Sequence, residues 1–250
     1  TNVYLISQSN PGTSTSNGIT IENENNNYVI VLNGVNIRRG SHSNQYTALS
    51  VNPVGTAEVH IILKDGTKNY LYSGRNRAGL EKEGLSTGLL LLTCEAGYNE
   101  WLNNPNAGHN DSSNYNASLC ATSGCGHIDA RSGNAWTSKG SANTYYGGAG
   151  IGTKGYSNGG SNIEGQMAGS NALDNLTIAG GNILALGGRG QGADDSSGGG
   201  ANIGTGSAST SSVISGTVTR FKITGGNFDL LRGDNSAACI GGGYRSGYVN

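Results

Sequence analysis

Short alternations of apolar and polar residues, separated by glycine-rich corners, run along most of the 250-residue chain. One phrase occurs twice, as Leu176-Thr-Ile-Ala-Gly-Gly-Asn-Ile-Leu-Ala-Leu186 and as Phe221-Lys-Ile-Thr-Gly-Gly-Asn-Phe-Asp-Leu-Leu231. Each copy is followed by an Ile-Gly phrase, at 201–204 and 238–241, and 149–152 has the same form. Alternation predicts strands, and Gly-Gly-Asn predicts a corner between them. Each copy therefore has the pattern of one coil of a β-solenoid, whose apolar face is buried by stacked neighbours.

Other short apolar runs predict further strands in the first part of the chain. They occupy 19–21, 28–32, 35–37, 48–51, 57–63, 70–72, 77–80 and 89–93, with corners at 33–34 and 64–69. No segment keeps a helical period of 3.6 over ten residues. We therefore expect an all-β chain. With about 25 residues per coil outside the insertion, the chain would form about eight coils, stacked at the distance between neighbouring parallel strands.

The range 95–146 interrupts the pattern. It lacks a repeated strand phrase, and it holds both tryptophans and two of the four histidines. Connections of this length are usually functional or disordered, and its aromatic residues argue against disorder. We expect a single domain over 1–250, with 95–146 as one long loop insertion. Because the pattern stops in mid-coil near Asn250, we also expect a longer parent protein, or an end covered by a partner or another copy.

Composition narrows the classes of function. Gly makes up 44 residues, charged residues only 12%, and the net charge is −1. Nucleic acid binding needs more Lys and Arg than this. No apolar run approaches the 18 residues of a membrane span, so membrane insertion is not expected. The low charge and the abundance of Gly, Asn, Ser and Thr favour an extracellular or cell-surface protein.

Four cysteines, Cys94, Cys120, Cys125 and Cys239, allow three disulfide connectivities. The pair Cys120 and Cys125 can close a tight loop or anchor a longer one. For Cys94 and Cys239, a role as small buried apolar residues is as well supported as a disulfide. The spacing is poor for a structural zinc site.

The succession 32–37, 63–71, 78–81, 149–152 and 176–182 resembles the bacterial carbohydrate-binding-type β-helix domains of secreted and cell-surface proteins. The resemblance covers roughly 19–94 and 147–243. It implies a right-handed parallel β-helix (a solenoid) similar to pectate-lyase-like proteins. It also implies attachment to a polysaccharide or host glycan, sometimes with calcium.

Aromatic rings cover the apolar face of a sugar, and amides, carboxylates and guanidinium groups bond its hydroxyls. The tryptophans can equally form a small core of the insertion. Two basic pairs, Arg38-Arg39 and Arg75 with Arg77, can contact acidic sugars or decorate solvated corners. The candidate glycan-binding residues are Trp101, Trp136, Tyr145, Tyr146, His109 and His127.

Enzymes of the β-helix fold are a second class to weigh. Asp194-Asp195, Gly126-His127 and Arg220-Phe-Lys222 resemble parts of the pectin-hydrolase motifs, but their order along the chain is wrong. Asp194 and Asp195 are also weak candidates for Ca²⁺, which needs six to eight oxygen ligands; a solvated corner explains the pair equally well. No other cofactor is expected.

The sequence thus favours a glycan-binding adhesive module over an enzyme. Two alternatives stay open: a polysaccharide lyase or glycoside hydrolase of the same fold, and a structural subunit that assembles end to end into extracellular fibres. A close carboxylate pair in an open groove would favour the enzyme. A flat, uncovered apolar end would favour assembly.

Overall fold

The computed structural model describes residues 2–23, 26–39, 45–84, 86–106, 124–133, 147–155, 172–190, 198–207, 217–230 and 237–243. Of these residues, 53% are in strands and 5% in helix, so the expected all-β class is confirmed. The strands are β1 (Asn2–Ser7), β2 (Ile19–Asn23), β3 (Tyr28–Asn33), β4 (Asn36–Arg38), β5 (Leu49–Pro53), β6 (Glu58–Leu63), β7 (Lys68–Arg75), β8 (Leu80–Lys82), β9 (Leu89–Cys94), β10 (His127–Gly133), β11 (Ile151–Gly152), β12 (Leu173–Leu186), β13 (Ile203–Gly204), β14 (Val218–Leu230) and β15 (Ile240–Gly241).

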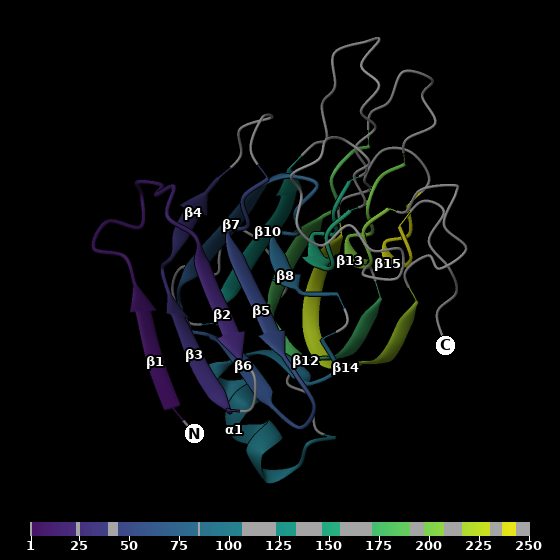
Figure 1. The fold of residues 1–250 in the computed structure, drawn as a ribbon. Helices are drawn as coiled ribbons and strands as arrows, with labels where there is room; N and C mark the ends of the chain where they lie inside the picture. The colour runs from purple at the N-terminus through teal and green to yellow at the C-terminus, as the bar shows by residue number, and fades with distance from the viewer. Residues whose placement is uncertain are drawn as a thin grey trace.

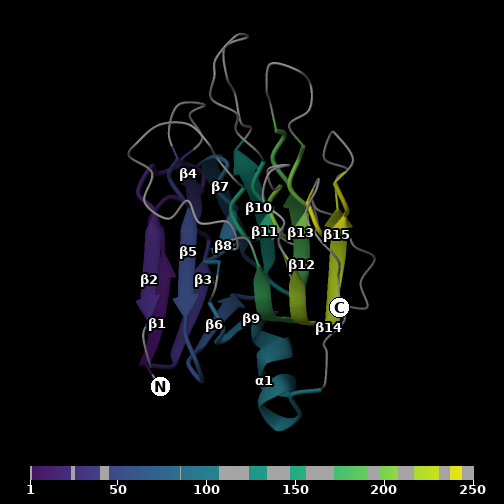
Figure 2. The ribbon, with the colours of Figure 1, turned by 45° about the vertical axis from the view of Figure 1, so that its right-hand side comes forward.

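The strands form two parallel sheets. The larger one has nine strands in the order β1-β3-β6-β9-β12-β10-β7-β4, with β14 also paired to β12. The smaller one has six strands in the order β15-β13-β11-β8-β5-β2. Figure 2 shows the strands advancing from β1 and β2 at one end of the molecule to β14 and β15 at the other. Among the described residues, the six strands of the smaller sheet mark six successive tiers, where the length of the chain predicts about eight coils.

The larger sheet is curled because β12 and β14 bend in their middle. Leu176–Ile178 of β12 pairs with β9, whereas Asn182–Leu186 pairs with β10. The bend lies at the Gly-Gly pair, where Gly181 has φ +104° and the equivalent Gly226 has φ +111°. Glycine adopts such angles without the steric cost of a Cβ atom. The Gly-Gly-Asn corners expected from the sequence are therefore confirmed.

The Ile-Gly phrases stack on one another in β11, β13 and β15. Gly152, Gly204 and Gly241 pair in register and have φ of +138°, +142° and +128°. A Cβ atom at Gly204 would lie 1.8 Å from the carbonyl oxygen of Gly241. Glycine is thus required here both by the backbone angle and by the approach of the next tier.

The core lies between the two sheets and is built from columns of side chains in register. Its buried members come from both sheets, for example Ile61 and Leu90 from the larger and Leu49 and Leu80 from the smaller. Burying each such side chain stabilises the fold by about 1.5–3 kcal/mol. One column runs from end to end: Tyr4, Ile30, Ile61, Leu92, Ile178 and Ile223. Its inner four members are buried, while Tyr4 is 49% and Ile223 38% exposed.

The range 95–146 contains regular structure that the sequence pattern did not predict. Helix α1 (Glu95–Asn103) follows β9 directly and lies at the lower edge of the molecule (Figure 1). Strand β10 pairs with β7 and β12 in the middle of the larger sheet. The all-β reading therefore missed one short helix, and part of the expected loop insertion belongs to the sheet. Within the described ranges, no helix is long and apolar enough to cross a bilayer.

Candidate functional site

A row of charged and aromatic side chains lies on the outer face of β4, β7 and β10. Along β7 the buried residues Asn69, Leu71 and Ser73 alternate with Tyr70 and Tyr72, which are only partly buried. This alternation follows from the period of two of a strand, which directs successive side chains to opposite faces. Tyr70 and Tyr72 therefore face outward from the sheet.

Register brings two arginines to either side of Tyr72. Arg38 of β4 and Arg131 of β10 are both paired with Tyr72. The Cζ atom of Arg38 lies 4.2 Å from the centroid of the Tyr72 ring, and that of Arg131 lies 4.9 Å from it. These distances are within the range of cation–π contacts. The Tyr72 ring is thus contacted by two guanidinium groups.

Asp129 fixes one side of this arrangement. Its carboxylate accepts hydrogen bonds from Nε and Nη2 of Arg131, at 2.7 and 2.8 Å, and from the Tyr72 hydroxyl at 2.7 Å. Burial, together with the Asp129 carboxylate, raises the pKa of Tyr72 to about 12, so its hydroxyl stays protonated and donates. Two-point contact with a carboxylate is the strong geometry for arginine. Arg131 is therefore held rigidly.

Arg38 has a different environment. It is exposed, and its Nε donates to the Asn36 side-chain oxygen at 3.1 Å. Its Cζ atom also lies 5.6 Å from the ring of Tyr70, whose ring is 6.2 Å from that of Tyr72 at an angle of 85°. Two guanidinium groups and one carboxylate leave this surface with a net positive charge. We call Arg38, Tyr70, Tyr72, Asp129 and Arg131 the arginine–tyrosine row.

Sequence reasoning named only Arg38 from this row. Tyr70, Tyr72, Asp129 and Arg131 were missed, although Tyr-Leu-Tyr and Asp-Ala-Arg both alternate with the period of a strand. That alternation was the available signal for an outward polar face. Of the other basic residues singled out, Arg39 has its Cζ atom 4.5 Å from the centroid of the Tyr46 ring, and Arg77 lies against Glu81 and Glu83.

Trp101, an expected sugar platform, fastens α1 to the sheet. Its ring packs against the edge of His60 of β6, with centroids 5.0 Å apart, and it stacks on Tyr98 at 6.3 Å. His60 also lies 2.9 Å from a Glu58 oxygen and 3.1 Å from the Tyr98 hydroxyl. Burial lowers the pKa of His60, which favours the neutral ring. These contacts match the alternative reading, in which the tryptophan packs internally.

His127 lies at the start of β10 and is buried, between Lys68 and Asn182 in register. Burial lowers its pKa, and its Nδ1 atom has no hydrogen-bond partner among the described residues. Little of its ring is therefore accessible to a glycan. The remaining candidates lie outside the described residues: Trp136, Tyr145, Tyr146, His109, Asp194, Asp195 and Cys120.

The structure brings two of the four cysteines together. The Sγ atoms of Cys94 and Cys125 lie 2.6 Å apart, and both residues are buried. Cys239 is exposed beside β15. With Asp65, the two cysteines form a cluster of potential metal ligands whose donor atoms all lie within 4.8 Å of one another. Two sulfurs and a carboxylate do not suit Ca²⁺, which takes oxygen ligands.

A carboxylate pair also occurs, at Glu81 and Glu83. Arg77 Nη2 lies 2.6 Å from Glu81 and 3.3 Å from Glu83. Burial raises the pKa of Glu81 to about 7, whereas for Glu83 the nearby Arg77 and Lys154 outweigh burial and lower the pKa. Such opposed shifts are typical of acid–base pairs. Glu81 has no exposed surface, however, so a polymer cannot reach it.

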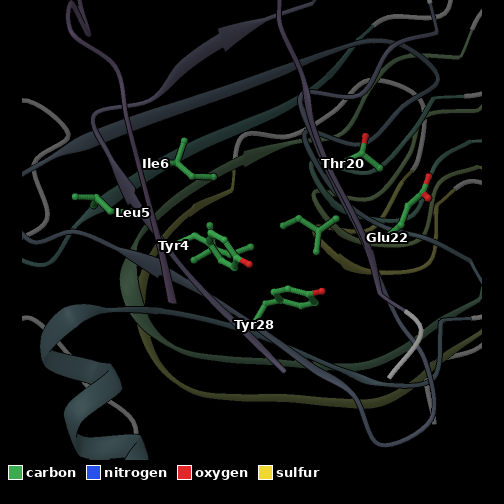
Figure 3. Close-up of a pocket in the computed structure, with 8 residues that line it drawn as sticks. Tyr4, Leu5, Ile6, Thr20, Glu22 and Tyr28 are labelled. Carbon is green, nitrogen blue, oxygen red and sulfur yellow. The ribbon is translucent and has the colours of Figure 1, made fainter. Parts of the chain in front are cut away.

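A pocket of about 350 Å³ opens between the two sheets at the β1 and β2 end (Figure 3). The rings of Tyr4 and Tyr28 lie 6.0 Å apart at its wall. The pocket lies at the end of the core, beside β1 and β2, the edge strands of the two sheets. It is lined by Tyr4, Leu5, Ile6, Thr20, Ile21, Glu22, Tyr28 and Ile30.

Comparison of the chain with protein-family models, with curated proteins and with solved structures finds no match. The chemistry of its own side chains is therefore the guide to its function.

Proposed function

We propose that this chain is a glycan-binding module of a secreted or cell-surface protein, and that the arginine–tyrosine row binds an acidic polysaccharide. The observation that carries the proposal is the Tyr72 ring flanked by Arg38 and Arg131 on an outward sheet face. Aromatic rings pack on the apolar face of a sugar, and guanidinium groups bond carboxylates with two parallel hydrogen bonds. The row offers both groups side by side.

The charge of the row favours an acidic over a neutral glycan. The whole chain has a net charge of −1, yet this surface carries two arginines against one carboxylate. Asp129 already occupies Arg131, whereas Arg38 bonds only to the neutral Asn36 amide in the contacts described. Arg38 is therefore the group we expect to bind a sugar carboxylate.

The parallel strands also suit a polymer. Neighbouring strands lie about 4.8 Å apart, close to the length of one sugar residue, so a polysaccharide crossing the strands would meet equivalent positions at regular intervals. On the same face of the sheet follow Tyr70 paired with Asp129, and then Lys68 in register with the buried His127 and Asn182. A chain of sugars lying across β4, β7 and β10 would thus contact the row over several residues.

We further propose that the two parallel sheets form a right-handed β-helix, as in the carbohydrate-binding β-helix domains that the sequence resembles. The order of the smaller sheet supports this, because β2, β5 and β8 are neighbours in space and each pair is separated by strands of the larger sheet. Parallel crossovers are right-handed in about 98% of known cases. An experimental structure would show the hand directly.

The binding proposal is tested with polygalacturonate and with its neutral methyl ester in affinity electrophoresis and titration calorimetry. We expect binding to the acidic form, weakened by salt. The variants Arg38→Ala and Tyr72→Ala should each lose at least tenfold in affinity. Arg220→Gln is the matched control, since Arg220 is also an exposed arginine but pairs with Asp174 on β12. Equal loss in all three variants, or no binding across a panel of acidic glycans, would contradict the proposal.

Two further readouts separate the related hypotheses. Repeating the titration with EDTA tests the expected calcium site at Asp194 and Asp195, which predicts a loss of binding when the metal is removed. Measuring reducing or unsaturated sugars after incubation tests the enzyme alternative. Release of either product would favour the lyase or hydrolase alternative over the binding-module proposal.

End-to-end assembly is a second candidate, favoured by the exposed apolar residues at both ends of the sheets. Val3 and Leu5 of β1 are 69% and 63% exposed, and Ile223 and Ile240 are partly exposed on β14 and β15. Because all tiers are parallel, the β14 edge of one copy could continue onto the β1 edge of the next with the same pairing. Such head-to-tail contacts do not close and therefore produce filaments.

Sedimentation and electron microscopy over a range of concentrations test this candidate. We expect assemblies that grow with concentration and that Leu5→Lys abolishes. Val54→Lys is the control, since Val54 is 41% exposed in the turn between β5 and β6, two strands that lie inside their sheets. A monomer at every concentration would exclude assembly by this chain.

A further inference from the structure

We propose that Cys94 and Cys125 form a disulfide that closes the base of the chain segment between β9 and β10. Cys94 is the last residue of β9, and Cys125 lies two residues before β10. Although they are 31 positions apart in sequence, their Sγ atoms lie 2.6 Å apart in a buried site. The fold therefore holds the two sulfur atoms within reach of each other.

Non-covalent contacts already hold the same two chain ends at the corner between β6 and β7. The two oxygens of Asp65 accept hydrogen bonds from the backbone N–H groups of Ala96 and Gly126, at 3.3 and 3.2 Å. The N–H of Gly66 donates to the carbonyl of Gly124 at 2.9 Å. Because these contacts position both cysteines, the bond needs little movement of the backbone, which is the condition for an unstrained disulfide.

The geometry favours a disulfide over a metal site. Two thiolates on one tetrahedral Zn²⁺, each about 2.3 Å from the metal, hold their sulfurs about 3.8 Å apart. The 2.6 Å between Cys94 and Cys125 is much shorter than this. In addition, the third potential ligand, Asp65, already has both oxygens engaged by backbone N–H groups.

The chemistry is a two-electron oxidation. The two thiols release two protons and two electrons and form one S–S bond. The oxidant is a second disulfide, either a thiol–disulfide oxidoreductase or glutathione disulfide, which is reduced to two thiols. Such bonds persist in the oxidising environment of secreted and surface proteins. The inference does not depend on glycan binding.

The bond would tie α1 and the segment after it to the sheet. In the unfolded chain it closes a loop of about 30 residues and so removes conformational freedom. On this basis we expect the melting temperature of the oxidised protein to exceed that of the reduced protein by roughly 10 °C. A merely packed pair of thiols would show no such dependence on reductant.

Peptide mapping tests the pairing on protein refolded with reduced and oxidised glutathione, then denatured and alkylated without reductant. Trypsin leaves 83–131 as one peptide, so cleavage after Glu95 and before Asp111 is needed to separate Cys94 from the later cysteines. The variant Cys120→Ser removes the competing thiol. We expect one linked pair of peptides carrying Cys94 and Cys125, with Cys239 alkylated.

Variants and metal complete the test. Cys94→Ser with Cys125→Ser should remove the effect of reductant on the melting temperature, while Cys239→Ser should keep it. Alkylation of both Cys94 and Cys125 in the oxidised protein, or linkage of Cys94 to another cysteine, would overturn the proposal. So would stoichiometric binding of Zn²⁺ alone by the freshly refolded protein, with a rise in its melting temperature.

Discussion

The Nδ2 atom of Asn227 donates a hydrogen bond to Oδ1 of Asn182, 3.0 Å away, at the same corner of two successive tiers. Asn182 in turn donates to the carbonyl of Cys125 at 2.8 Å. The two asparagines stand beside their Gly-Gly bends, and Asn182 is buried. The repeated Gly-Gly-Asn phrase therefore supplies a ladder of hydrogen bonds as well as a bend.

Replacing Asn182 by Ala should destabilise the fold by about 1–3 kcal/mol, because the partly buried Asn227 amide and the buried Cys125 carbonyl each lose a partner. Chemical denaturation measures the change. Asn99→Ala, at an exposed position of α1, is the control and should change stability by less than about 0.5 kcal/mol. Similar losses of unfolding free energy in both variants would show that the asparagine ladder does not stabilise the fold.

Gly204→Ala should destabilise the fold by more than about 4 kcal/mol or prevent folding. The added Cβ would overlap the Gly241 carbonyl and would sit at a φ of +142°. Gly55→Ala separates the two causes, since Gly55 also has positive φ, +63°, but no atom within 4 Å of the added Cβ. That variant should lose only about 1–2 kcal/mol. Circular dichroism and denaturation would show the difference.

Glu81 should make stability depend on pH. Its pKa is raised from 4.5 to about 7, so the folded state binds its proton more tightly than the unfolded state does. The stabilisation is complete below pH 4.5 and is lost as pH rises through 7, by on the order of 3 kcal/mol. Glu81→Gln should flatten this decline in a series of denaturation curves. An unchanged slope in the variant would assign the decline to other groups.

Lys82 should make stability increase with pH above pH 7, whereas Glu81 makes it decrease below pH 7. Burial lowers its pKa from 10.5 to about 7, so the unfolded state binds the proton more tightly. Stability therefore rises between pH 7 and 10.5 and is lost as pH falls through 7. With Glu81, this predicts a minimum of stability near pH 7. Lys82→Met should remove the rise above pH 7, whereas Lys64→Met, at a half-exposed lysine, should keep it.

Tyr72→Phe should separate the ring from its hydroxyl. The ring between Arg38 and Arg131 stays, so affinity for an acidic glycan should change by less than about threefold. The lost hydrogen bond to the Asp129 carboxylate should cost about 1.5–3 kcal/mol of stability. Calorimetry and denaturation measure the two effects. A loss of affinity as large as in Tyr72→Ala would mean that the hydroxyl, not the ring, contacts the ligand.

The sequence was sufficient to predict those features of the fold that depend only on residues adjacent along the chain. Alternation predicted most strands, and the Gly-Gly-Asn and Ile-Gly phrases predicted their corners, because positive φ at Gly181 or Gly204 is a local property. The sequence pattern did not predict helix α1, because its nine residues are too few to show a helical period. Its attachment depends on His60, which lies about forty positions earlier and gives no signal near Trp101.

The candidate surface was harder to foresee because it is assembled by register. Arg38, Tyr72 and Arg131 lie in three separate strands, and no local motif joins them. Strand β10 lies within a polar stretch of sequence, so the pattern alone places Asp129 in a loop. The use of Trp101 and His127 as glycan contacts stays a prediction, as does that of the candidates outside the described ranges.

The stacked glycines have a consequence for how such a chain can change over time. At Gly152 and Gly204 an added Cβ atom would lie 1.8 Å from the carbonyl oxygen of the glycine in the next tier, so neither position has room for a side chain. A single substitution at these glycines is therefore penalised, whereas in the proposed β-helix the duplication of a whole coil would carry its glycine with it. The paired phrases 45 positions apart fit such a history. In the β-helix proposed above, length is thus the property that can vary most freely, and each added coil would bring a new set of outward side chains.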